Sequence, residues 1–205
     1  MAKVVHIVGN GDSADFYNRQ ERKGLKLTCN IPPFPVQGAY ATCIVDFKMM
    51  RSITAGEIDV PGEWILGHRP KIWMSQHPAF YMKRAGQIKE FFTLKPSYVK
   101  NYTDFNCGHM ATYYALNKFK PDEINLYGFD SIFDMNLRSS SDFYQHSDRN
   151  HGNNVRLNTN WRPIWQNMFD EFQDVKFVLH HFHNDIKFPV KENVSIISYG
   201  KKGQK

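Results

Sequence analysis

The chain has 205 residues, and its 41% hydrophobic and 15% aromatic content supplies enough apolar surface for a buried core, which excludes an intrinsically disordered protein. The formal net charge of +6 permits attraction to polyanions and is compatible with nucleotide binding. No run of about 18 apolar residues occurs, and the N-terminus lacks the apolar segment of a signal peptide, so we expect no membrane-spanning helix and no secretion signal.

The first stretch predicts a strand, a tight turn and a helix. Four of residues 4–8 are β-branched, and Gly9-Asn10-Gly11 ends this run. Asp12 or Ser13 is able to cap the polar helix expected at 15–23. In an open α/β sheet such a turn lies at the carboxyl end of a strand, where ligands bind. The glycines permit close approach of a ligand, and free N–H groups at the helix start suit a phosphate. The alternative is an ordinary first turn that binds nothing.

The next elements come in the same alternating order. Strands are predicted at 25–30, 41–45 and 71–75, and a helix is predicted to begin at 49–53. The proline-rich residues 31–35 form a rigid loop, since proline continues neither a central strand nor a helix. Residues 79–94 are either a helix or an irregular aromatic cover.

The second half repeats the alternation. A helix at 110–119, a strand at 124–130, a helix at 161–172, a strand at 175–179 and an edge strand at 194–199 are predicted. Residues 134–160 are polar and lack a period, which is typical of a lid-like loop, and residues 201–205 form a tail. The stripe formed by Trp161, Trp165, Phe169 and Phe172 is expected to lie in the core.

Strands that alternate with helices predict an α/β fold, here a single Rossmann-like domain over residues 1–205 with a mostly parallel sheet flanked by helices. The ends of the strands would then gather at one edge of the sheet. The polar and glycine residues expected there are Asn10, Asn30, Asp46, Gln76, Gly108, Gly128 and Asp130. They suit a base and a ribose better than a metal, because the P-loop and paired-aspartate signatures of magnesium–nucleotide sites are missing.

Three cysteines, Cys29, Cys43 and Cys107, lie far apart and form no CxxC pair. We therefore expect neither a disulfide framework nor a zinc site, and the location predicted is the cytoplasm. Cys107 begins a helix, which is one cause of a reactive thiol, but a small packing residue is the preferred interpretation.

The order of the motifs resembles the bacterial sialyltransferases of glycosyltransferase family 42 and the family 29-like glycosyltransferases of bacteria and phages. The family motifs are GNGPS, R-C-N, S-G-x-x-A and L-x-G-x-D, followed by a lid with a catalytic histidine. Here they correspond to residues 9–13, 29–30, 107–111 and 124–130 and to a loop with two histidines, so that the resemblance covers residues 3–180.

The resemblance implies a GT-A-variant domain that transfers a sugar from a CMP-linked donor to an acceptor hydroxyl without a metal or another cofactor. His151, or alternatively His146, would be the general base, since the pKa of histidine lies near working pH. The donor site would comprise Gly9, Asn10, Gly11, Ser13, Asn30, Asp46, Cys107, Gly108, Gly128, Asp130 and Tyr144. The acceptor, a glycan or a nucleic acid, and the oligomeric state are left open.

Several positions depart from the family pattern. Asp12 replaces a proline, Cys107 a serine and Asp46 an asparagine, which places a negative charge beside an anionic donor. Ile132 stands where the family has a tyrosine that binds the leaving phosphate, and Tyr144 is the candidate for a second such tyrosine. A different sugar donor, or a protein that has lost transfer, therefore remains open.

The remaining histidines have structural as well as functional interpretations. His6 is expected to be a satisfied core residue, and His109 either caps its helix or contacts a ligand. His180, His181 and His183 are expected at the surface or a pocket rim rather than at a metal, because no cysteine or carboxylate lies at zinc spacing.

A second function of a different class also fits, namely a basic nucleotide- or nucleic-acid-binding protein on the same fold without transfer. Such a protein should concentrate lysine and arginine along one groove. The basic residues are dispersed in the sequence, which favours the transferase. The two functions merge if the acceptor is itself a nucleic acid.

Overall fold

The computed structural model describes residues 3–132, 161–182, 189 and 191–199. The predicted lid-like loop at 134–160, with Tyr144, His146 and His151, lies outside the described residues. So do His183 and the tail at 201–205.

Eight strands form one sheet in the order β5-β4-β3-β2-β1-β6-β7-β8, and every neighbouring pair is parallel. This confirms the predicted α/β class with a parallel, Rossmann-like sheet. The strands are β1 (Val4–Val8), β2 (Leu25–Cys29), β3 (Ala41–Ile44), β4 (Trp64–Leu66), β5 (Ile88–Phe91), β6 (Glu123–Tyr127), β7 (Lys176–His181) and β8 (Val194–Ser198).

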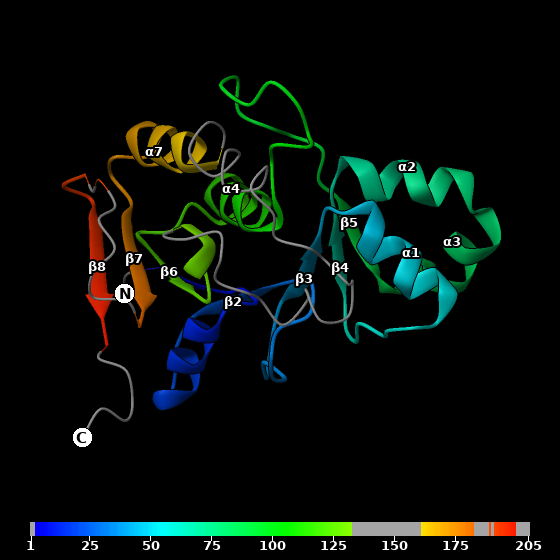
Figure 1. Cartoon of the computed structure of the whole chain (residues 1–205), viewed down its shortest axis with the longest axis horizontal. Coiled ribbons are helices and arrows are strands. Elements are labelled where there is room, and N and C mark those ends of the chain that lie inside the picture. Colours follow the sequence, from blue (N-terminus) through cyan, green and yellow to red (C-terminus); the bar gives the residue numbers. More distant parts are fainter. Residues whose placement is uncertain (1–2, 133–160, 183–188, 190, 200–205) are drawn as a thin grey trace.

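Helices cover both faces of the sheet (Figure 1). On one face, α4 (Cys107–Phe119) and α7 (Arg162–Glu171) pack on the inner residues of the central strands, in a core that includes Ile7, Leu126 and Trp165. On the other face lie the 3-10 helices η1 (Asp12–Arg19) and η2 (Ala85–Gln87), with α1 (Phe47–Ala55), α2 (His68–Gln76) and α3 (Pro78–Arg84). A short 3-10 turn, η3 (Asp130–Ile132), follows β6.

The predicted strand at 71–75 is wrong, because these residues lie in α2. A short apolar run does not by itself distinguish a strand from a buried helix segment, and Pro70 in the first turn favours the helix. The strand next to β3 in the sheet is instead β4, whose three buried residues are followed by Gly67. Within residues 79–94, for which a helix or an irregular cover was expected, the structure has the strand β5. Gln76 consequently lies at the end of a helix and not at the end of a strand.

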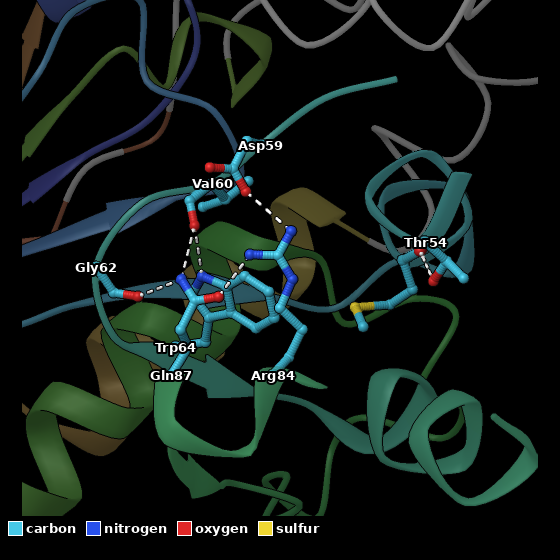
Figure 2. A network of polar contacts seen from close by, with 8 residues as sticks. Thr54, Asp59, Val60, Gly62, Trp64, Arg84 and Gln87 are labelled. Atoms are coloured by element: carbon cyan, nitrogen blue, oxygen red, sulfur yellow. Dashed lines mark hydrogen bonds and ion pairs between the residues drawn. The ribbon is translucent and has the colours of Figure 1, made fainter. Parts of the chain in front are cut away.

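The connection between α1 and β4 is held by polar contacts to the turn before β5 (Figure 2). The Gln87 side chain donates to the carbonyls of Val60 and Gly62, and it accepts from Arg84. Arg84 also pairs with Asp59 at 3.1 Å. These contacts fix the end of the sheet that carries α3.

Candidate functional site

The sheet changes winding direction between β1 and β6. Strands β2 to β5 extend to one side of β1, whereas β6 to β8 extend to the other. In open parallel sheets the two chain segments that leave such a pair diverge, and ligands bind in the crevice between them. The turn at residues 9–13 and the turn at residues 128–130 therefore meet at the position where a ligand is expected.

The two turns are bonded directly to each other. Gly9 N–H donates to the Tyr127 carbonyl at 2.7 Å, and Gly11 N–H donates to the Gly128 carbonyl at 2.9 Å. A Cβ atom at Gly11 would overlap the Asp130 carboxylate, and one at Gly9 would lie 2.7 Å from the Gly128 oxygen. Close packing of the two turns thus requires these glycines, independently of any ligand.

The start of η1 is already satisfied by the protein. Ser13 N–H donates to Asp130 Oδ2 at 3.0 Å, and the Ser13 hydroxyl donates to Asp130 Oδ1. The predicted free N–H group at Ser13 is therefore wrong, because a buried carboxylate occupies the position expected for a phosphate. The predicted cap is wrong as well, since Gly11 precedes η1 and no side chain caps it.

Two asparagines follow the carboxyl ends of β1 and β2, beside these turns. The Asn10 side chain donates to the Ile31 carbonyl, and Asn30 N–H donates to the Cys43 carbonyl at 3.0 Å. Asn30 has a left-handed backbone, with φ of 51°. Its Oδ1 is buried and has no hydrogen-bond partner within the described part of the chain. A buried acceptor without a partner is unfavourable, so this oxygen is suited to accept a hydrogen bond from a ligand.

Cys107 and Gly108 serve packing at this position. The Cys107 thiol is buried and donates to the Cys43 carbonyl at 2.8 Å. Burial raises the pKa of this thiol well above its usual range, so it stays protonated and is no nucleophile. A Cβ atom at Gly108 would overlap the ring of Phe129, which shows that the glycine admits this ring and not a ligand.

Asp46 is paired with a residue that the sequence analysis did not identify. The Arg69 guanidinium donates to Asp46 Oδ1 at 2.5 Å. The pair neutralises the negative charge that seemed incompatible with an anionic donor. Gly67, which ends β4, is the sequence feature that could have placed Arg69 at the same edge of the sheet as Asp46.

A small pocket adjoins this ion pair at the carboxyl ends of β3 to β5. It is lined by Val45, Gly67, His68, Arg69, Phe92, Leu94, Tyr102, Phe105 and Met110. The His68 and Tyr102 rings stack at 4.0 Å. Its cavity volume of about 10 Å³ admits at most a single water molecule, so as it stands it is too small for a nucleotide or a sugar.

His109 caps α4 and does not reach a ligand. Its backbone N–H donates to Asn106 Oδ1 at 3.0 Å, and its Nδ1 accepts from Asn106 N–H at 3.2 Å. Since Nδ1 accepts, Nε2 carries the proton and donates to the Trp161 carbonyl at 3.2 Å. Complete burial lowers the pKa of His109 to about 3, so the neutral ring is retained.

Two other histidines lie in the core of the η1 face. His180 Nε2 donates to Asn125 Oδ1 at 2.9 Å, and His6 Nδ1 lies 3.2 Å from the Tyr127 hydroxyl. The prediction for His6 is confirmed, whereas the surface or rim position predicted for His180 and His181 is wrong, because both are buried. Burial lowers the pKa of His180 to about 4.

The structure thus brings together most of the predicted donor residues at one edge of the sheet. Gly9, Gly11, Ser13, Gly128 and Asp130 build the paired turns, while Asn10, Asn30 and Asp46 present side-chain polar groups beside them. Among the described residues, no group of three histidine, cysteine or carboxylate side chains is arranged to hold a metal ion. In the same part of the chain, no helix is both long and apolar enough to cross a membrane.

Comparison with protein-family models, with curated proteins and with solved structures gives no match for this chain in any of the three.

Proposed function

We propose that this chain is a metal-independent glycosyltransferase of the sialyltransferase type, which binds a nucleotide sugar, CMP-linked by preference, in the crevice between β1 and β6. The observation that carries the proposal is the unsatisfied Oδ1 of Asn30 beside the paired turns at this crevice. A ribose hydroxyl or a base amino group is a donor of the kind that this oxygen lacks.

The internal bonding of the turns changes the expected role of each residue. Ser13 and Gly11 already donate to Asp130 and Gly128, and Asn10 Nδ2 already donates to the Ile31 carbonyl. The nucleotide would therefore be held mainly by the side-chain oxygens of Asn10 and Asn30. The Arg69–Asp46 pair would lie near the donor sugar and phosphate, and its cation would moderate their negative charge. The paired turns then act as a rigid support for these side chains.

In the transfer step, the acceptor hydroxyl oxygen would attack the anomeric carbon of the donor sugar. The bond from that carbon to the phosphate oxygen breaks, and CMP leaves with the electron pair. His151, or His146 in its place, would accept the hydroxyl proton as general base. Neither Cys107, which is buried and protonated, nor His109, which is committed to its helix cap, is available for this role.

The first test is thermal unfolding with CMP, CDP, UMP, UDP, GDP and AMP in the absence of metal. At about 100 times Kd, a ligand that binds only the native state stabilises it by about 2.7 kcal/mol, which is readily measured. We expect a cytidine-selective stabilisation that is lost in Asn30→Gly, a variant whose backbone tolerates the left-handed conformation.

The second test separates transfer from binding. CMP-sugar hydrolysis by the wild type but not by His151→Ala would support the proposed transferase. Cytidine binding without hydrolysis of any donor would favour the alternative, a nucleotide-binding protein on the same fold. If no nucleotide stabilises the protein, the donor site itself is refuted.

A further inference from the structure

Three aromatic rings form a row where α1 packs against α2. The Phe47 and Trp73 ring centroids lie 6.3 Å apart, and Trp73 stacks on His77 at 4.0 Å with an interplanar angle of 14°. Hydrogen bonds fix the row, because Trp73 Nε1 donates to the Thr54 hydroxyl and His77 Nδ1 donates to the Trp73 carbonyl, both at 2.9 Å. Phe47, at the end of the row, is 38% exposed.

Basic side chains accompany this row. Arg51 lies four residues after Phe47, on the same side of α1. Lys48 lies three residues before Arg51, so these two side chains are also neighbours on the helix surface. Both cations are exposed, and neither has an ion pair within the described residues. We refer to Phe47, Lys48, Arg51, Trp73 and His77 as the ledge.

The surrounding helices are also positively charged. Residues 47–84 contain six lysines and arginines and three carboxylates, a net charge of +3 out of +6 for the whole chain. Two of these carboxylates, Asp59 and Glu63, are already paired with Arg84 and Lys89. The basic residues that looked dispersed in the sequence therefore leave an excess of unpaired cations on the α1–α3 layer.

We propose that the ledge is a binding site for single-stranded nucleic acid, in which bases stack on the exposed end of the aromatic row and phosphates contact Lys48 and Arg51. Flat rings accept any base, and exposed cations follow the backbone, which is the usual combination for single strands. The proposal is independent of the donor site. It does place the strand near that site, because α1 begins just after β3 at the same edge of the sheet.

The geometry favours a single strand over a duplex or a membrane. In a duplex the bases are stacked on one another and do not present their faces to a protein side chain. A membrane-binding surface would use the most protruding apolar side chain of this layer, which is Met82 on α3 at 74% exposure, outside the ledge. These alternatives make different predictions for Phe47 and Met82.

The test measures the fluorescence anisotropy of a labelled oligo-dT and oligo-rU of about 12 nucleotides, over a range of salt concentrations. The double variant Lys48→Ala/Arg51→Ala should reduce the slope of log K against log salt by about 1.4, since each phosphate contact contributes about 0.7 for single strands. Phe47→Leu keeps the apolar contact with Trp73 but loses the flat ring, and it should weaken binding about tenfold at constant salt.

Two control variants accompany these. Lys100→Ala removes an exposed lysine outside α1–α3, and Met82→Ser removes the apolar side chain on α3 without changing its charge; both should bind the oligonucleotides like the wild type. Thermal unfolding of each variant, with and without CMP, shows that the fold is intact and reports the donor site separately.

The proposal is overturned if the wild type binds neither oligonucleotide, or if Phe47→Leu and the double variant bind as well as Lys100→Ala. It is also overturned if duplex DNA or a sulfated polysaccharide of equal charge binds as tightly as the oligonucleotides. If the protein binds anionic vesicles but no oligonucleotide, and Met82→Ser abolishes vesicle binding while Phe47→Leu does not, the layer is a membrane surface instead.

Discussion

Asn30 combines two features that an isolated fold would avoid. Its backbone is left-handed, and its side-chain oxygen is buried without a hydrogen bond from any described residue. Asparagine tolerates the left-handed region better than other non-glycine residues, but the conformation still has a cost. Strain of this kind is concentrated at ligand sites, where binding is the compensation.

We therefore expect Asn30→Gly to uncouple stability from binding. Glycine adopts the left-handed backbone freely and carries no unsatisfied oxygen, so the free energy of unfolding should rise by about 1 kcal/mol. Stabilisation by CMP should disappear in the same protein. Urea unfolding with and without CMP measures both quantities, and a variant that is less stable yet still binds CMP would contradict this role.

Asp46 and Arg69 make a partly exposed ion pair, so its contribution to stability is small. In Asp46→Asn the residue matches the asparagine of the family pattern and leaves the guanidinium free. We expect a loss of stability of less than about 1 kcal/mol and a gain of about fivefold in affinity for an anionic nucleotide. Isothermal titration of CMP measures the affinity, and Arg69→Gln, which reverses the charge change, should weaken binding.

At the residue scale, the sequence predicted the polar groups that follow recognisable strands. Asn10, Asn30 and Asp46 were found because each comes after an apolar run. Arg69 was missed because β4 has only three residues and the longer apolar run beyond it lies in α2. The hydrogen bonds from Ser13 to Asp130 could not be predicted from the sequence, since they join residues that are 117 positions apart.

At the scale of elements, α4 depends on how closely it approaches the turn after β6. Its second residue is Gly108, and the Phe129 ring occupies the space where a Cβ would lie, with Cδ1 at 2.9 Å from that position. The start of α4 can therefore lie close to the turn after β6 only because Gly108 has no side chain and leaves room for the Phe129 ring. A pattern of hydrophobic spacing predicts the helix but gives no information on this contact, because it involves no periodicity.

We expect Gly108→Ala to lower the free energy of unfolding by about 2 kcal/mol, since an added methyl group must displace a packed ring. The double variant Gly108→Ala/Phe129→Ala removes that overlap, so the two substitutions should cost less together than the sum of their separate effects. A double-mutant cycle by urea unfolding measures the coupling. Additive effects would mean that the glycine serves ligand approach rather than packing.

At the scale of the whole molecule, three buried histidines in different parts of the sheet must stay neutral. His109 caps α4 on one face, while His6 and His180 lie on the other under η1. Burial is the main cause of the lowered pKa of all three, and the cation of Arg22 adds to it for His6 and His180. In the unfolded chain each titrates near about pH 6.5.

Stability should therefore fall as the solution becomes acidic. Below about pH 6.5 the unfolded chain binds protons that the native protein excludes, so each buried histidine lowers the free energy of unfolding by up to about 1.4 kcal/mol per pH unit, down to its native pKa. The lower limits of this window are about 4 for His180 and about 3 for His109. Above about pH 7 both states are neutral at these positions and the effect disappears.

His109→Gln is the matched test of this linkage. Glutamine at the third position of a helix completes a capping box, so its oxygen replaces Nδ1 as acceptor for Asn106 N–H, and its amide replaces Nε2 as donor to the Trp161 carbonyl. The variant should retain most of its stability at about pH 7.5 and lose less of it at about pH 5, because one of the three titrating groups is gone. Urea unfolding at both pH values measures the difference. A pH dependence identical to that of the wild type would place the origin of acid sensitivity in other groups.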